Sequence, residues 1–361
     1  MARIILHIGT HKTGTTGMQR ALFAQREQLS RNGICYDPWP ACLSGTKYAH
    51  HGLAHRLARF DPDDRKVLDK YRLRIERGLA RGEDVIISAE PFYRQIAAGI
   101  PEDPDRARIK FLDRTADYFA DFPVEISICF RRPDCMAESM FKEQAVSIGN
   151  EVDFLPWLNK CAMRFDYSAR IREFEERFGT TKVWCFEDAI TRGLITSFFD
   201  EHGLNFSGLS DAKADRKSLS CAATMWLLRA NQSEQDMSVS ERRVRWYYAV
   251  SQHAHARLKL VGKKTFWADA ETRDDFISVA LTDFSRRDFW TLPTDNPDPV
   301  TWSKKNQDEV TSHYEKWLTR NQILLKMRKD AKLSPYDPDS KIPLKKRFRY
   351  LPWQIKDWLR R

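Results

Sequence analysis

Short apolar runs alternate with longer amphipathic stretches along residues 3–205. A short apolar run bounded by turn residues is typical of a buried strand, whereas apolar residues that recur every three or four positions are typical of a helix. The apolar runs predict strands over residues 3–8, 34–36, 85–88, 124–130 and 182–186.

The stretches between these runs carry the residues that usually begin helices. Asp61 and Asp166 are suited to cap a helix N-terminus, and Pro133 is suited to the first helical position. One predicted helix ends at residue 31 and another begins at residue 133. The others cover residues 62–81, 106–122, 166–178 and 191–202.

Strands that alternate with helical crossovers imply a parallel sheet covered on both faces. We therefore predict an α/β protein built as a three-layer sandwich with a central parallel sheet, plus a helical C-terminal part. Ligands of such sheets bind beyond the carboxyl ends of the strands. One large domain over residues 1–330 is expected, with a core over 1–205 and a helical part over 206–330, followed by a linker and a tail over 331–361.

The composition is that of a soluble globular protein, with 42% hydrophobic and 30% charged residues. No apolar run approaches the roughly 20 residues that a membrane-spanning helix needs, and the first strand turns polar too soon for a signal peptide. Seven cysteines are scattered without a C-x-x-C pair, which favours a reducing compartment over a disulfide framework or a zinc site. We therefore expect a cytoplasmic protein.

The net charge of +10 is concentrated in the tail, where residues 341–361 hold eight Lys or Arg and one acid, Asp357. The same tail has apolar residues at helical spacing, interrupted by Pro352. A basic amphipathic segment of this kind predicts peripheral contact with the anionic inner face of a membrane. The alternative is a terminal helix that docks on the body of the protein with its charges in water.

A loop rich in Gly and Thr follows the first strand and opens a helix. Glycines allow the sharp turn, and the free N–H groups and positive dipole end of a helix start attract an anion. The loop is not a Walker A motif, because Gly14 is followed by threonine instead of lysine, and it is not G-x-G-x-x-G. We predict that it binds a phosphate; the alternative is a turn that binds nothing. The candidate binding residues are His11, Lys12, Thr13, Gly14, Thr15 and Thr16.

A second basic motif follows the strand at residues 124–130. Arg131, Arg132 and Pro133 come directly after it, and Ser139 lies in the helix that Pro133 begins. An arginine at the carboxyl end of a parallel strand faces the ligand edge, where its forked guanidinium suits a phosphate. Taken alone, the motif is more typical of a surface corner. Together with the Gly/Thr loop, at the right order and distance along the chain, it favours a phosphate site.

The two motifs together resemble those of sulfotransferases that use 3′-phosphoadenosine-5′-phosphosulfate (PAPS), of the bacterial carbohydrate-type branch. The family's first loop usually reads Pro/Arg-Lys-Ser/Thr-Gly-Thr-Thr, and its second motif Arg-x-Pro-(x)5-Ser puts Arg131 and Ser139 in matching places. A third stretch, residues 182–204, resembles the family's strand–Tyr-Glu-Asp-Leu–helix segment with Phe186 for tyrosine. The resemblance covers residues 3–205 and implies a P-loop-like sulfotransferase fold with a nucleotide-binding core.

The resemblance also implies the chemistry: a sulfuryl group passes from PAPS to an acceptor hydroxyl, without a metal, and 3′-phosphoadenosine-5′-phosphate (PAP) is released. The expected acceptor is a carbohydrate or glycolipid, and no nucleic-acid partner is expected. Lys12 would stabilise the charge that grows on the leaving oxygen. The family closes a basic loop over the 3′-phosphate, which Arg216 and Lys217 match loosely; a solvated charge cluster explains them equally well.

The acceptor hydroxyl needs a base within hydrogen-bond reach. Glu90, at the end of a buried strand, is the first candidate and His51 is the second. His51 and His55 are also spaced i, i+4, as metal ligands can be, but the sequence offers no third ligand. Two other functions stay open: a nucleotide-dependent kinase or NTPase with a variant phosphate loop, and a non-catalytic nucleotide-binding protein.

Overall fold

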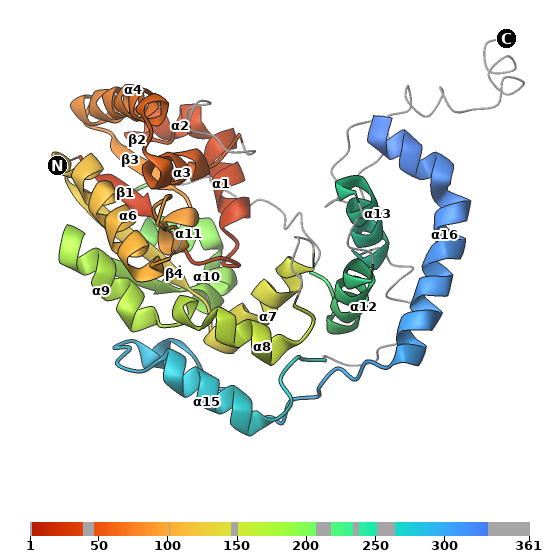
Figure 1. The fold of residues 1–361 in the computed structure, drawn as a ribbon. Coiled ribbons are helices and arrows are strands. Elements are labelled where there is room, and N and C mark those ends of the chain that lie inside the picture. The colour runs from red at the N-terminus through yellow and green to blue at the C-terminus, as the bar shows by residue number, and fades with distance from the viewer. Residues whose placement is uncertain are drawn as a thin grey trace, which may run out of the picture. The chain divides into compact units, whose positions relative to one another are not determined.

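The structure is a computed structural model (Figure 1) that describes residues 2–38, 47–100, 102–145, 151–206, 218–233, 238–250 and 264–330. The chain divides into two compact units, which are described separately. The predicted tail lies outside the described residues. Unit 1 comprises Met1–Met136, Cys161–Ala214 and Asp275–Pro293, and unit 2 comprises Ala137–Lys160, Asp215–Asp274 and Thr294–Arg361.

Unit 1 is built on a five-stranded sheet, all parallel, in the order β2-β3-β1-β4-β5. Most strand residues are buried, as expected when helices cover both faces of a sheet. This confirms the α/β class and the central parallel sheet. The strands are β1 (Ile4–His7), β2 (Ile34–Cys35), β3 (Asp84–Ser88), β4 (Val124–Phe130) and β5 (Thr181–Cys185).

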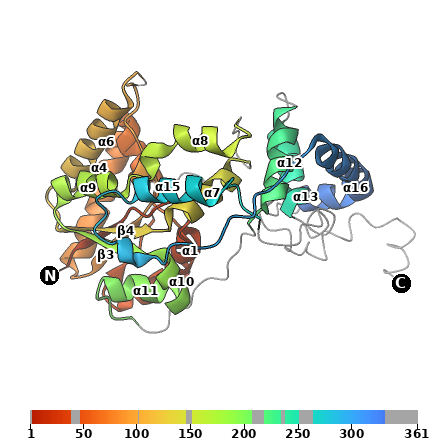
Figure 2. The same cartoon turned by 90° about the horizontal axis from the view of Figure 1, so that it is seen from below.

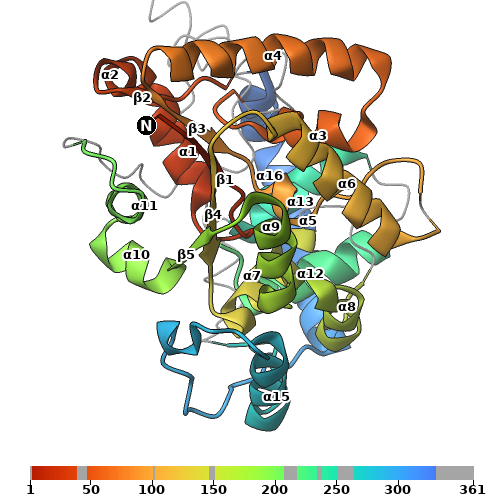
Figure 3. The ribbon, with the colours of Figure 1, turned by 90° about the vertical axis from the view of Figure 1, so that its left-hand side faces the viewer.

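Helices flank the sheet on both sides (Figure 2 and Figure 3). On one side, Ile5 and Ile86 of the sheet share an apolar cluster with Leu22 and Phe198 of two helices. On the other side, α9 packs on β4 and β5, and α6 packs on α9. The helices of this unit are α1 (Thr15–Ala24), α2 (Arg26–Arg31), α3 (His51–Arg59), α4 (Pro62–Ala80), α5 (Pro91–Arg94), α6 (Pro104–Phe119), α9 (Tyr167–Phe178), α10 (Phe186–Arg192) and α11 (Leu194–Glu201).

Capping residues set several helix starts as predicted. Asp61 accepts a hydrogen bond from the Asp64 N–H at the start of α4, and Asp166 accepts one from the Ala169 N–H at the start of α9. The helix predicted from residue 106 begins earlier, because Asp103 is its cap.

Two predicted helices are each replaced by a pair. The helix that ends at residue 31 is broken at Gln25 into α1 and α2. The helix predicted over residues 191–202 is interrupted at Gly193, whose φ of 97° is incompatible with a helix; α10 precedes it and α11 follows it.

Unit 2 is helical, as predicted for the C-terminal region. Its α12 (Cys221–Gln232) packs on α13 (Val239–Val250), and both contact α16 (Lys304–Asp330) (Figure 1). Aromatic rings fill the space between these helices, among them Trp226 and Tyr248 with centroids 5.2 Å apart. The unit also contains α8 (Phe154–Lys160). Two helices are shared between the units: α7 (Pro133–Gln144) begins in unit 1 and ends in unit 2, and α15 (Ala270–Ala280) begins in unit 2 and ends in unit 1. No described helix is both long and apolar enough to span a membrane.

Candidate functional site

The strand order identifies one position at the carboxyl edge of the sheet. The chain leaves β1 toward β2 on one side and leaves β4 toward β5 on the other, although β1 and β4 are neighbours. Crossovers that diverge in this way leave a crevice between the two strands, which is where open α/β sheets bind ligands. The loop after β1 and the Arg131–Arg132 pair after β4 both lie at this point.

The loop over residues 8–14, called here the Lys12 loop, is fixed to β4. The Ile8 N–H donates to the Ser127 carbonyl (3.0 Å), and the Thr10 N–H (3.2 Å) and hydroxyl (2.8 Å) both donate to the Cys129 carbonyl. The Thr13 hydroxyl donates back to the Thr10 carbonyl (2.7 Å). The loop is therefore a rigid extension of the β1–β4 ladder.

Left-handed backbone conformations shape the Lys12 loop. Gly14 has a φ of 70°, and a Cβ there would lie 2.8 Å from Cδ2 of Leu194. Lys12 has a φ of 69°, which costs a residue with a Cβ about 1–2 kcal/mol. Strain of this kind collects at ligand-binding sites. Gly14 is also the N-cap of α1 and has no side chain to cap the first turn, so the helix start is suited to an anion.

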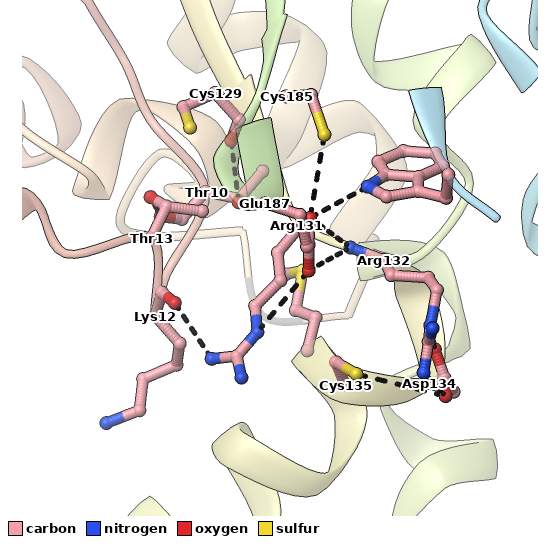
Figure 4. A network of polar contacts seen from close by, with 12 residues as sticks. Thr10, Lys12, Thr13, Cys129, Arg131, Arg132, Asp134, Cys135, Cys185 and Glu187 are labelled. Atoms are coloured by element: carbon pink, nitrogen blue, oxygen red, sulfur yellow. Dashed lines mark hydrogen bonds and ion pairs between the residues drawn. The ribbon is translucent and has the colours of Figure 1, made fainter. Parts of the chain in front are cut away.

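Arg131 faces the Lys12 loop. Its Nη1 donates to the Lys12 carbonyl (3.1 Å), and its guanidinium lies over the Phe186 ring at 5.3 Å from the centroid. In Figure 4 the Lys12 side chain and the Arg131 guanidinium both extend away from the sheet. Two cationic side chains from neighbouring strand ends thus lie on the same side of the loop.

Arg132 has a different role from its neighbour. Its guanidinium forms two hydrogen bonds with the Asp134 carboxylate, at 2.7 and 3.0 Å (Figure 4). Burial lowers the pKa of Arg132, but the hydrogen bonds and charge of Asp134 outweigh it and raise that pKa above its ordinary value. Of the two arginines, Arg131 is therefore the one available to a ligand at the loop.

Glu187 links several residues of this site, and no role for it is predicted from the sequence. Its carboxylate accepts from the Arg132 N–H (3.2 Å) and from Nε1 of Trp290 (2.8 Å), and it lies 4.0 Å from Nε of Arg131. The only signal in the sequence was its place in the stretch that resembles the family's strand–Tyr-Glu-Asp-Leu segment.

Glu90 is buried at the carboxyl end of β3. Its carboxylate accepts hydrogen bonds from the Thr15 hydroxyl, from Nε2 of Gln19 (3.2 Å) and from Nε2 of His51. Burial raises the pKa of Glu90, but the hydrogen bond and charge of His51, the charge of His11 and the Thr15 hydroxyl outweigh it. The pKa of Glu90 is consequently held well below its ordinary value.

His51 reaches Glu90 because the preceding residue ties α3 to β3. The His50 N–H donates to the Ser88 carbonyl (3.0 Å), and the Ser88 N–H donates to Nδ1 of His50 (3.1 Å). Burial lowers the pKa of His50 to about 3, so this ring is a neutral structural acceptor. The two base candidates, which the sequence analysis left as alternatives, are therefore in direct contact.

The remaining predicted residues fall into three groups. Thr13 and Thr15 are buried with their hydroxyls bonded inside the protein, whereas His11 and Thr16 are partly exposed. Ser139 lies on the part of α7 that belongs to unit 2. Arg216 and Lys217 lie outside the described residues. Among the residues that are described, no three His, Cys, Asp or Glu side chains form a group suited to a metal ion.

Comparisons with known proteins add no name to this site. No protein-family model, no curated protein and no solved structure matches the chain significantly.

Proposed function

We propose that this protein is a PAPS-dependent sulfotransferase, which transfers a sulfuryl group to an acceptor hydroxyl of a carbohydrate or glycolipid. The observation that carries the proposal is the pairing of Lys12 and Arg131 at the crevice between β1 and β4. PAPS bears a 5′-phosphosulfate and a 3′-phosphate, and two cations on neighbouring strand ends suit a ligand with two separate anionic groups.

The loop supplies a second kind of support. A strained backbone, an uncapped helix start and a lysine within the turn suit an oxyanion that gains charge during the reaction. In sulfuryl transfer the charge grows on the oxygen that bridges phosphorus and sulfur, and Lys12 would stabilise it there.

Thermal-shift measurements with PAP, PAPS, ATP and ATP–Mg²⁺ test the proposal. PAP at a hundred times its dissociation constant should stabilise the protein by about 2.7 kcal/mol without added metal. AMP, which lacks the 3′-phosphate, should stabilise it less at the same concentration. Stabilisation by ATP only when Mg²⁺ is present, and none by PAP, would instead identify a kinase or NTPase.

A further inference from the structure

Glu90 and His51 are in contact, but they are not equivalent. The Glu90 side chain is 7% exposed, whereas the His51 side chain is 22% exposed. Oε1 of Glu90 accepts from Thr15, and Oε2 accepts from Gln19 and His51. The carboxylate is thus enclosed by donors from α1 and α3.

This enclosure makes Glu90 a poor acceptor of a further proton. Its donors hold the carboxylate in the ionised form and lower its pKa, and a general base works best when its pKa is near the working pH. Both carboxylate oxygens are also directed at groups within the protein. An acceptor hydroxyl would have to displace one of these donors to reach Glu90.

His51 is the more exposed of the two side chains and contacts Glu90 through Nε2. An ionised carboxylate next to Nε2 requires that Nε2 carry a hydrogen, so in the neutral ring the lone pair is on Nδ1. Nε2 is directed at Glu90, and Nδ1 is the ring's second nitrogen. The arrangement is that of an imidazole oriented by a buried carboxylate, which is the general pattern of an activated base.

We infer that His51 accepts the proton of the acceptor hydroxyl at Nδ1, and that Glu90 is a positioning residue that holds the ring by Nε2; this rests on the proposed sulfotransferase function. The acceptor oxygen forms a bond to sulfur as the bond between sulfur and the bridging oxygen of PAPS breaks. The electron pair of that bond leaves on PAP, and the hydroxyl proton goes to His51. The resulting imidazolium is stabilised by Glu90 and later releases its proton to water.

Histidine NMR spectra test the geometry without any substrate. Protein with isotope-labelled histidine should show a downfield, hydrogen-bonded Nε2 proton for His51, assigned by its loss in His51→Gln. The Glu90→Gln variant should lose the downfield shift, because the charged acceptor is gone. His55→Gln, one helical turn further along α3, is the matched control and should leave the signal unchanged. A proton on Nδ1 of the neutral His51 ring, or a signal that is unchanged in Glu90→Gln, would overturn the inference.

Turnover of radiolabelled PAPS with a panel of sugar acceptors tests the role. His51→Ala should lower turnover about 100- to 10,000-fold while PAP stabilises the variant as it does the wild type. Imidazole added to the solution should restore part of the activity of His51→Ala but none of that lost in a Lys12→Ala variant. Restoration of this kind is not expected from a residue with a merely structural role.

The proposed function and the role of His51 can be refuted separately. If PAP does not stabilise the wild-type protein, the proposed function fails and the inference falls with it. If PAP stabilises the protein but His51→Ala keeps its turnover, only the inference is wrong. Full turnover in Glu90→Gln would leave His51 as the base but would remove Glu90 as its positioning residue.

Discussion

The guanidinium of Arg131 donates a hydrogen bond to the backbone carbonyl of Lys12, so the two motifs at the ends of β4 and β1 are joined directly. They are separated by more than a hundred residues of sequence, and the neighbouring positions of their strands bring them together. The proposed ligand would contact both at once.

Arg131→Ala should weaken PAP binding about 10- to 100-fold, since a hydrogen bond to a charged group contributes about 1.5–3 kcal/mol. If the guanidinium of Arg131 contacts the 3′-phosphate, the variant should also lose the preference for PAP over AMP. Arg132→Ala is the matched control, because its side chain is bonded to Asp134. Calorimetric titration with PAP measures the affinity of both variants. Equal losses of affinity in Arg131→Ala and Arg132→Ala would contradict the assignment of Arg131 to the binding site.

Lys12→Ala and Lys12→Gly separate the charge of this residue from its backbone strain. Both remove the ammonium group and should lower the proposed turnover about 100- to 1,000-fold. Glycine tolerates a φ of 69° whereas alanine does not, so Lys12→Gly should be about 1 kcal/mol more stable than Lys12→Ala. Urea unfolding measures this difference, and equal stabilities would show that the loop relaxes without strain.

Gly14→Ala should destabilise the protein for two reasons that a control can separate. The left-handed φ costs a Cβ about 1–2 kcal/mol, and the added Cβ would also press on Leu194. At Gly33 the φ is 76° and nothing lies within 4 Å of an added Cβ, so Gly33→Ala measures the backbone effect alone. Any excess loss at Gly14 in urea unfolding reports the contact with Leu194; a smaller loss than at Gly33 would contradict the close approach.

The buried histidines predict a loss of stability in mild acid. Burial lowers the pKa of His7 to about 4 and that of His50 to about 3, from an ordinary value near 6.5. Below pH 6.5 the unfolded chain therefore binds protons that the folded protein does not. The contribution of each histidine to the free energy of unfolding is fully present above pH 6.5. It falls by about 1.4 kcal/mol per pH unit down to the folded-state pKa.

His50→Asn tests this pH dependence, because the asparagine oxygen can replace Nδ1 as the acceptor for the Ser88 N–H. Urea unfolding of the variant between pH 7 and pH 4.5 should show a shallower loss of stability than the wild type. An unchanged slope would mean that other groups cause the acid sensitivity.

The strands and several helix starts could be predicted from the sequence, because apolar runs and capping residues act locally. The position of the Lys12 loop and of Arg131 followed from the rule for parallel sheets. Helix α3 was missed because His50 provides no side-chain cap, and its start is instead fixed by bonds to Ser88. The break at Gln25 has no glycine or proline to announce it.

The site was predicted as a set of residues but not as a set of contacts. Glu90 and His51 are 39 positions apart, and their pairing depends on how α3 docks on β3. The amide of Gln19 on α1 also donates to Glu90, and no sequence motif points to this contact. The role of Glu187 depends on Trp290, about a hundred residues further along the chain, and no local pattern in the sequence could reveal that.

Thr15 is both the first residue of α1 and a donor to Glu90. One side chain therefore joins the helix end that follows the Lys12 loop to the carboxylate that holds His51. Free energies of binding at two coupled positions are reciprocal. If an anion at the loop changes the protonation of the Glu90–His51 pair, the protonation of that pair must change the affinity for the anion by the same factor. Binding of the anion and protonation of the Glu90–His51 pair would then be one thermodynamic event, measurable as protons exchanged with the buffer when PAP binds.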